Sequence, residues 1–119
     1  MKVQMRGQEL RFRIDEDELA SLLDGGEVQD VTRVGPDDSL LRSVVLHDGP
    51  TPEFAFTPRN WRLRLPGIAV RAHAARLPCR DALAFDLPGD GDVALAVRLE
   101  VDVRDSLRVR GAKRRSERD

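Results

Sequence analysis

The stretch VQMRGQELRF, residues 3–12, decides the fold, because it can form two antiparallel strands joined by a turn at Gly7-Gln8. Glycine readily takes the positive φ that the first central position of a type II′ hairpin turn requires. In this register every apolar side chain lies on one side of the hairpin and every polar side chain on the other. The facing apolar pairs are Met5 with Leu10, Val3 with Phe12 and Met1 with Ile14. The sequence therefore predicts a β-hairpin with one buried and one solvated face.

The next segment has the apolar spacing of a helix instead of a strand. Asp15 can cap its first turn, with Glu18 three residues later as in a capping box, and Gly25 is a good left-handed stop. The apolar stripe consists of Leu19, Leu22 and Leu23. We expect a short helix over about residues 16–24 that lays these leucines on the sheet.

Three further pairs of strands are predicted along the chain. Residues 27–47 contain two strands around the turn signal GPDDS, without a defined register. Residues 53–66, EFAFTPRNWRLRLP, form a second hairpin that places Phe56 opposite Trp61 and Phe54 opposite Leu63. In a third hairpin over residues 83–103, we expect Leu83, Phe85 and Leu87 to face Val97, Leu95 and Val93. Residues 67–77 fit either a strand or a helix, and their pattern favours a helix.

These segments predict an α+β fold, mainly antiparallel β, with about seven or eight strands and one short helix. A curved sheet packed on the helix and a partly open β-barrel both fit the pattern. A chain of 119 residues suits one domain, which we expect over residues 1–107. Residues 108–119 have no periodicity and hold six basic and two acidic side chains. They predict a basic, disordered tail.

The composition excludes several classes of protein. With 40% hydrophobic and 34% charged residues the chain has the make-up of a globular protein, not of a disordered one. No apolar run approaches the roughly 18 residues that a membrane helix needs, and the N-terminus does not read as a secretory signal. The single Cys79 permits no internal disulfide. We therefore expect a cytoplasmic protein with no membrane association.

The few residues suited to metal binding or nucleophilic catalysis are scattered. His47, His73 and Cys79 would have to converge to hold a zinc ion, and their spacing supplies no preorganised pair of ligands. No serine or cysteine has a local base to activate it. We expect no catalytic residue, no metal and no cofactor.

The last predicted strand carries the sharpest chemical pattern. In EVDVR, residues 100–104, Glu100, Asp102 and Arg104 share one face. The pattern is similar to the strands of triphosphate-tunnel enzymes, in which carboxylates hold a divalent cation and basic residues hold phosphates. The arginines that could complete such an anionic-ligand site are Arg11, Arg13, Arg62 and Arg64. A solvated sheet face with cross-strand ion pairs explains the same alternation, and we favour that interpretation.

Nucleic-acid binding is not favoured. The hairpin arginines and the basic tail could contact phosphates. However, the remainder of the chain is mildly acidic, exposed stacking aromatics are not evident, and no glycine-rich loop or helix-turn-helix signature is present.

Three stretches resemble a small uncharacterised bacterial family, a domain of unknown function. They are MKVQMRGQELRFRIDEDELASLLDGG (1–26), VQDVTRV (28–34) and FTPRNWRLRLP (56–66). The family pattern begins MKIRIxGNSIRFRLxxxEVxxLxxxG. Its late segment EKDFxCLD has a cysteine that this chain lacks in LEVDVRD (99–105). The resemblance implies a compact β-rich fold and no particular activity.

Taken together, the sequence favours a small, non-enzymatic cytoplasmic binding or interaction module. Its partner could be a protein or a second copy of the chain, joined through a sheet edge or a sheet face. The alternative is a binder of phosphate or polyanionic ligands, or a metal-dependent hydrolase of the tunnel type, using the charged residues named above.

Overall fold

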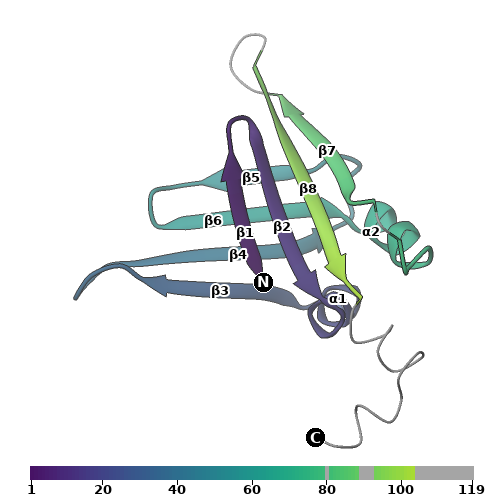
Figure 1. Ribbon diagram of the computed structural model, residues 1–119, viewed down its shortest axis with the longest axis horizontal. Coiled ribbons are helices and arrows are strands. Elements are labelled where there is room, and N and C mark those ends of the chain that lie inside the picture. The colour runs from purple at the N-terminus through teal and green to yellow at the C-terminus, as the bar shows by residue number, and fades with distance from the viewer. Residues whose placement is uncertain (80, 89–92, 104–119) are drawn as a thin grey trace, which may run out of the picture.

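The computed structural model describes residues 1–79, 81–88 and 93–103, and within them the chain forms eight strands and two helices (Figure 1). The first half contains β1 (Lys2–Arg6), β2 (Glu9–Asp15), α1 (Glu16–Leu23), β3 (Glu27–Arg33) and β4 (Ser39–His47). The second half contains β5 (Glu53–Phe56), β6 (Asn60–Pro66), α2 (Gly67–Ala74), β7 (Leu83–Pro88) and β8 (Ala94–Asp102). Residues 104–119 lie outside the described residues. This range includes Arg104 and the predicted tail.

The strands form two mixed sheets that run crosswise to each other (Figure 1). Sheet A has the order β1-β2-β8-β7 and sheet B the order β3-β4-β6-β5. In each sheet the two outer pairs are antiparallel, whereas the central pairs, β2 with β8 and β4 with β6, are parallel. The α+β class is confirmed, with strands predominating. The predicted predominance of antiparallel pairing holds for four of the six strand pairs in the described part of the chain. The prediction of one curved sheet or one partly open barrel is wrong, because the strands form two separate sheets joined internally by parallel pairs. Alternation along a strand does not report which distant strand it will join.

The first two predicted hairpins are confirmed with their registers. Gly7 has a φ of 55°, and β1 pairs with β2 so that Met5 faces Leu10 and Val3 faces Phe12. In the second hairpin Phe56 faces Trp61 and Phe54 faces Leu63.

The third hairpin is displaced by two residues from the predicted register. Leu83 pairs with Leu99 instead of Val97, and Leu87 pairs with Leu95 instead of Val93. A shift of two residues keeps the same side chains on the same face, so the apolar pattern could not distinguish the two registers. The strands predicted within residues 27–47 are present as β3 and β4, with Val28 opposite Val44.

Both helices follow their local sequence. α1 begins with the predicted capping box, in which Asp15 accepts from the Glu18 amide and the Glu18 side chain accepts from the Asp15 amide. Gly25, with a φ of 92°, follows its C-terminus. Residues 67–74 form α2, which confirms the favoured interpretation of that segment and adds a second helix to the single one predicted.

The two halves of the chain repeat the same order of elements and the same strand pairing. Each contains a seven-residue strand followed directly by an eight-residue helix, β2-α1 and β6-α2, with equivalent positions 51 residues apart. Phe12 of β2 pairs with Leu99 of β8, and its counterpart Leu63 of β6 pairs with Val44 of β4. Each sheet therefore combines a hairpin from one half of the chain with a hairpin from the other half.

The core lies between the inner faces of the two sheets and under the helices. Its buried apolar side chains come from both halves: Leu10, Phe12, Ile14, Leu19, Leu22, Val28, Val44, Leu63, Leu65, Val70, Val97 and Leu99. Burial of these side chains is the main favourable contribution to folding.

Among the described residues of the second half, one buried position is polar. His73 of α2 occupies the place that Leu22 holds in α1, and it is 3% exposed. Burial lowers the pKa of His73, the Arg76 guanidinium lowers it further, and Asp81 opposes the shift. Arg76 Nη2 lies 3.4 Å from His73 Nδ1.

We expect the parent chain to lose stability in mild acid because of His73, and the His73→Leu variant to be free of that loss. Below the ordinary histidine pKa of 6.5 the unfolded chain takes up a proton that folded His73 takes up only at lower pH, so the free energy of unfolding falls. Chemical unfolding at about pH 8 and about pH 5 should show a larger loss for the parent chain than for the variant. Equal losses would mean that His73 is not buried in the folded state.

Candidate functional site

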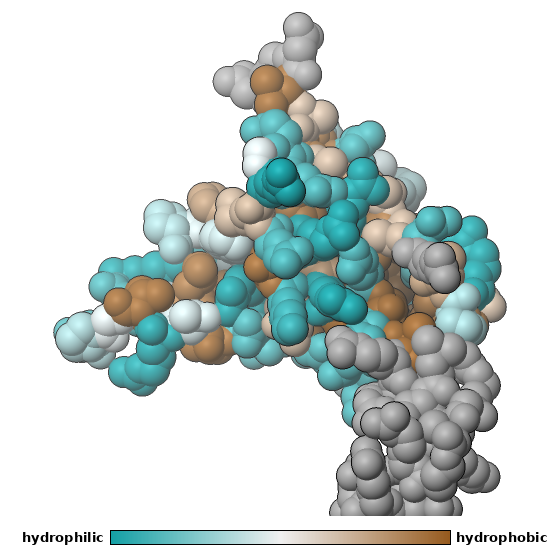
Figure 2. All heavy atoms as spheres, viewed as in Figure 1, coloured by the Kyte–Doolittle hydropathy of each residue, from teal (hydrophilic) through white to brown (hydrophobic). Residues whose placement is uncertain are grey.

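Four of the charged residues predicted as ligand-binding come together on the outer face of sheet A. Arg11 forms an ion pair with Glu100, and Arg13 lies 3.9 Å from Asp102. Beside them, Glu9 accepts hydrogen bonds from Arg98 and Arg11, and the bond from Arg98 is the main cause of its lowered pKa. Figure 2 shows the hydrophilic surface that covers much of sheet A. This face has the cross-strand ion pairs of a solvated sheet.

The other two predicted arginines lie on the outer face of sheet B. Arg62 is 3.7 Å from Glu27, and Arg64 is 3.1 Å from Glu53. In a tunnel both sets of arginines would face one charged interior. Here an apolar core separates them, so the structure does not bring Arg11 and Arg13 together with Arg62 and Arg64.

The histidines and the cysteine lie on separate elements. His47, at the end of β4, bonds to the Thr51 carbonyl and accepts from the Gly49 amide. His73 is buried in α2, and Cys79 follows that helix as a half-buried free thiol. Among the described residues no three His, Cys, Asp or Glu side chains are grouped so that they could hold a metal ion.

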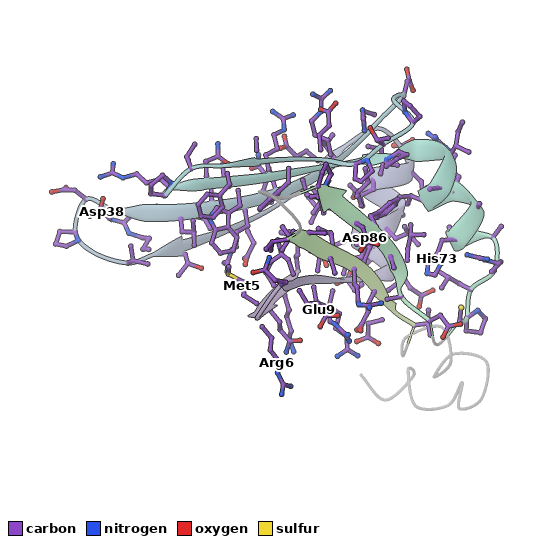
Figure 3. The ribbon with its side chains drawn as sticks, turned by 90° about the horizontal axis from the view of Figure 1, so that it is seen from above. Met5, Arg6, Glu9, Asp38, His73 and Asp86 are labelled. Carbon is purple, nitrogen blue, oxygen red and sulfur yellow. The ribbon has the colours of Figure 1, made fainter. Side chains whose placement is uncertain are left out.

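A mainly apolar pocket lies where the hairpins β1-β2 and β5-β6 meet. Its volume is about 310 Å³, and it is lined by Met5, Gly7, Glu9, Leu10, Phe54, Phe56, Trp61 and Leu95. Figure 3 shows Met5 pointing toward sheet B, whereas Arg6 and Glu9 point away from it. The pocket is therefore an opening of the core between the two sheets.

The pocket is open because the crossed sheets do not cover each other completely. Met5 and Phe56 belong to the inner, core-facing rows of their hairpins, yet they are 64% and 57% exposed. Large apolar side chains exposed together commonly mark a binding surface. Met5 and Leu10 face each other in the first hairpin as Phe56 and Trp61 do in the second, so equivalent positions from both halves line the pocket.

Aromatic rings form the sheet B wall of the pocket. Phe56 stacks on Trp61 with ring centroids 5.4 Å apart, and Phe54 lies 6.0 Å from Phe56. Such stacking stabilises the pair beyond the burial of its area. The rings therefore give the pocket a firm apolar wall on one side.

Two neighbouring residues of sheet B each have a buried hydrogen-bond donor. Trp61 pairs with Arg42 across the parallel strands β6 and β4. Arg42 Nη2 donates to Asp30 and to Thr32. Trp61 Nε1 and Arg42 Nε are buried, and no group in the described part of the chain accepts a hydrogen bond from either.

The sequence predicts the pairing of Phe56 with Trp61 but does not predict that these rings border an opening. One sequence feature could have indicated the opening: Phe56 and Trp61 lie at the turn end of their hairpin, where a crossing sheet no longer covers them.

Comparisons with known proteins give no relative to guide the assignment: no protein-family model, curated protein or solved structure matches this chain. The resemblance to the uncharacterised bacterial family therefore stays a prediction. None of the helices in the described ranges is long and apolar enough to cross a membrane.

Proposed function

We propose that this protein is a non-enzymatic cytoplasmic binding module whose pocket between β1-β2 and β5-β6 holds a small apolar molecule. The observation that carries the proposal is an aromatic-walled opening of the core with Met5 and Phe56 exposed at its rim. Its volume of about 310 Å³ falls at the small end of ligand pockets, which are typically lined by apolar side chains and a few polar groups.

The alternative of a polyanion site has less support. Each of Arg11, Arg13, Arg62 and Arg64 already has a carboxylate partner. A phosphate would have to replace those partners on two separate faces. We therefore place binding in the pocket and assign the ion pairs to the solvated faces of the sheets.

The proposal predicts that the uncharged dye N-phenyl-1-naphthylamine binds the full chain with a rise in fluorescence. Phe56→Ser should weaken binding roughly tenfold, because it removes apolar contact area from the rim. The matched control is Ile68→Ser, which removes an apolar residue that is 82% exposed on α2. The measurement is a fluorescence titration of the parent chain and both variants.

Two outcomes would contradict this function. One is dye binding that Ile68→Ser weakens as much as Phe56→Ser does. The other is a chain that sediments as a dimer and becomes monomeric with Phe56→Ser, because a second copy would then occupy the opening. That result would assign the pocket to self-association.

A further inference from the structure

We propose that the free edge of β1 takes up an extended, acidic segment of a protein partner as a fifth strand of sheet A. This inference goes beyond the pocket and its ligand, because it concerns the backbone edge of the hairpin beside them. Addition of a strand to an open sheet edge is a recurrent mode of peptide recognition. Main-chain hydrogen bonds supply the affinity, and alternate side chains supply the specificity.

The first step is the hydrogen-bonding capacity of the edge. β1 is the outermost strand of sheet A and pairs with β2. The two-residue turn makes Arg6 and Glu9 a hydrogen-bonded pair, and such pairs alternate along an antiparallel ladder. In agreement, the Gln8 carbonyl points the other way and accepts from β8. The amides and carbonyls of Val3 and Met5 therefore point away from β2, and no strand in the described part of the chain pairs with them.

The second step is charge. Lys2 and Arg6, at the two ends of β1, are exposed, and no carboxylate of the described ranges lies within ion-pair distance of either. Arg11 and Arg13 on β2, in contrast, are paired with carboxylates of β8. Charged residues on an edge strand oppose pairing with a second copy, because Lys2 of one chain would lie opposite Arg6 of the other. The same two charges favour an acidic strand.

The third step is the surface beneath the added strand. Sheet B continues past β1, so a strand beside β1 would lie over the inner face of sheet B (Figure 1, Figure 3). On the side of the hairpin tips, Met5 and Phe56 are more than half exposed. Apolar side chains on the inner side of the added strand would cover them, while its outer side chains would lie beside Lys2 and Arg6. The structure thus favours a segment that alternates acidic and apolar residues.

The equivalent strand of the second half, β5, lacks these features. It has four residues and follows directly on Pro52. Its charged residue, Glu53, is already paired with Arg64. Short strands and prolines are common means of protecting a sheet edge. We therefore assign strand addition to β1.

The test is an NMR titration of the ¹⁵N-labelled full chain with two capped pentapeptides. One alternates glutamate with valine and has glutamate at both ends, and the other has lysine in place of each glutamate. We expect the glutamate peptide to bind about tenfold more tightly, because attraction to Lys2 and Arg6 replaces repulsion. The amide resonances of Val3 and Met5 should move most as they gain hydrogen bonds, and that of Gln4, which already bonds to β2, should move least.

Charge reversal provides a second readout. The double variant Lys2→Glu with Arg6→Glu should reverse the preference and bind the lysine peptide more tightly. The matched control is Arg33→Glu, which reverses an exposed charge at the end of the edge strand β3 and should leave both affinities unchanged. The comparison of the two peptides on the parent chain keeps the proposal falsifiable if a variant fails to fold.

Three results would overturn the inference. The first is that neither peptide binds the parent chain, or that both bind equally. The second is that Gln4 responds while Val3 and Met5 do not, because the peptide would then not lie along the free edge. The third is a parent chain that sediments as a dimer with the Val3 and Met5 amides already protected from hydrogen exchange, because a second copy would then occupy the edge. Dye binding is measured without peptide, so its failure would remove the proposed function and leave this inference standing.

Discussion

Phe12→Ala should lower the free energy of unfolding by about 3–5 kcal/mol. Phe12 is fully buried on β2, in the parallel pair with Leu99 of β8, and faces the inner side of sheet B. A domain of this size is commonly stable by about 5–15 kcal/mol, so the variant should lose much of its stability. Chemical denaturation, monitored by the fluorescence of the single tryptophan, measures the loss.

The matched control is Phe56→Ala. It makes the same chemical change at an inner-face position that is 57% exposed, and we expect a cost of at most about 1 kcal/mol. If the two variants lose similar stability, Phe56 is not at an open edge of the core. The opening described between the hairpins would then be closed in solution.

Ser43→Pro should cost about 3 kcal/mol or more. Ser43 lies inside β4, which pairs with β3 on one side and with β6 on the other, and it is 1% exposed. Proline cannot donate to the ladder, and its ring crowds the neighbouring strand, so proline is rarely found in a central strand. The measurement is thermal or chemical unfolding of the purified variant.

Ser43→Ala provides the control, because it removes the hydroxyl while keeping the backbone N–H, and it should cost about 1 kcal/mol. A Ser43→Pro variant as stable as Ser43→Ala would show that β4 is an edge strand. That finding would contradict the parallel joint between β4 and β6, on which sheet B depends.

The local structure could be predicted from the sequence because it depends on neighbours in the chain. The turn at Gly7, the pairing of Phe56 with Trp61 and the capping box of Asp15 with Glu18 all involve residues close in sequence. Each of these predictions is confirmed. Their physical causes are turn geometry, alternation of side chains and satisfaction of the first helical amides.

The arrangement of the sheets could not be predicted in the same way. Phe12 pairs with Leu99 and Leu63 pairs with Val44, and in each case two apolar faces match without any turn to fix their register. The two halves share the same topology but little sequence similarity. Between β2 and β6, the shared residues are mainly the arginines of LRFR (10–13) and WRLR (61–64).

The site was missed for a related reason. The sequence directs attention to charged residues such as Arg11 and Glu100, which the structure pairs with each other on a solvated face. The pocket instead arises from apolar residues of two hairpins, and their exposure depends on how far one sheet extends past the other. How far one sheet extends past the other depends on tertiary packing, and it cannot be predicted from the alternation of side chains within a hairpin.

The central claim is that each sheet combines a hairpin from each half of the chain. The two hairpins of a sheet meet in a parallel strand pair, β2 with β8 in sheet A and β4 with β6 in sheet B. This pairing brings β1-β2 and β5-β6 together around the pocket. Backbone amide and α-proton NOEs across β2–β8 and β4–β6 test it most directly. We expect the parallel pattern in both pairs, with Phe12 beside Leu99 and Leu63 beside Val44. Antiparallel NOEs at either joint, or no NOEs between β2 and β8, would contradict the account.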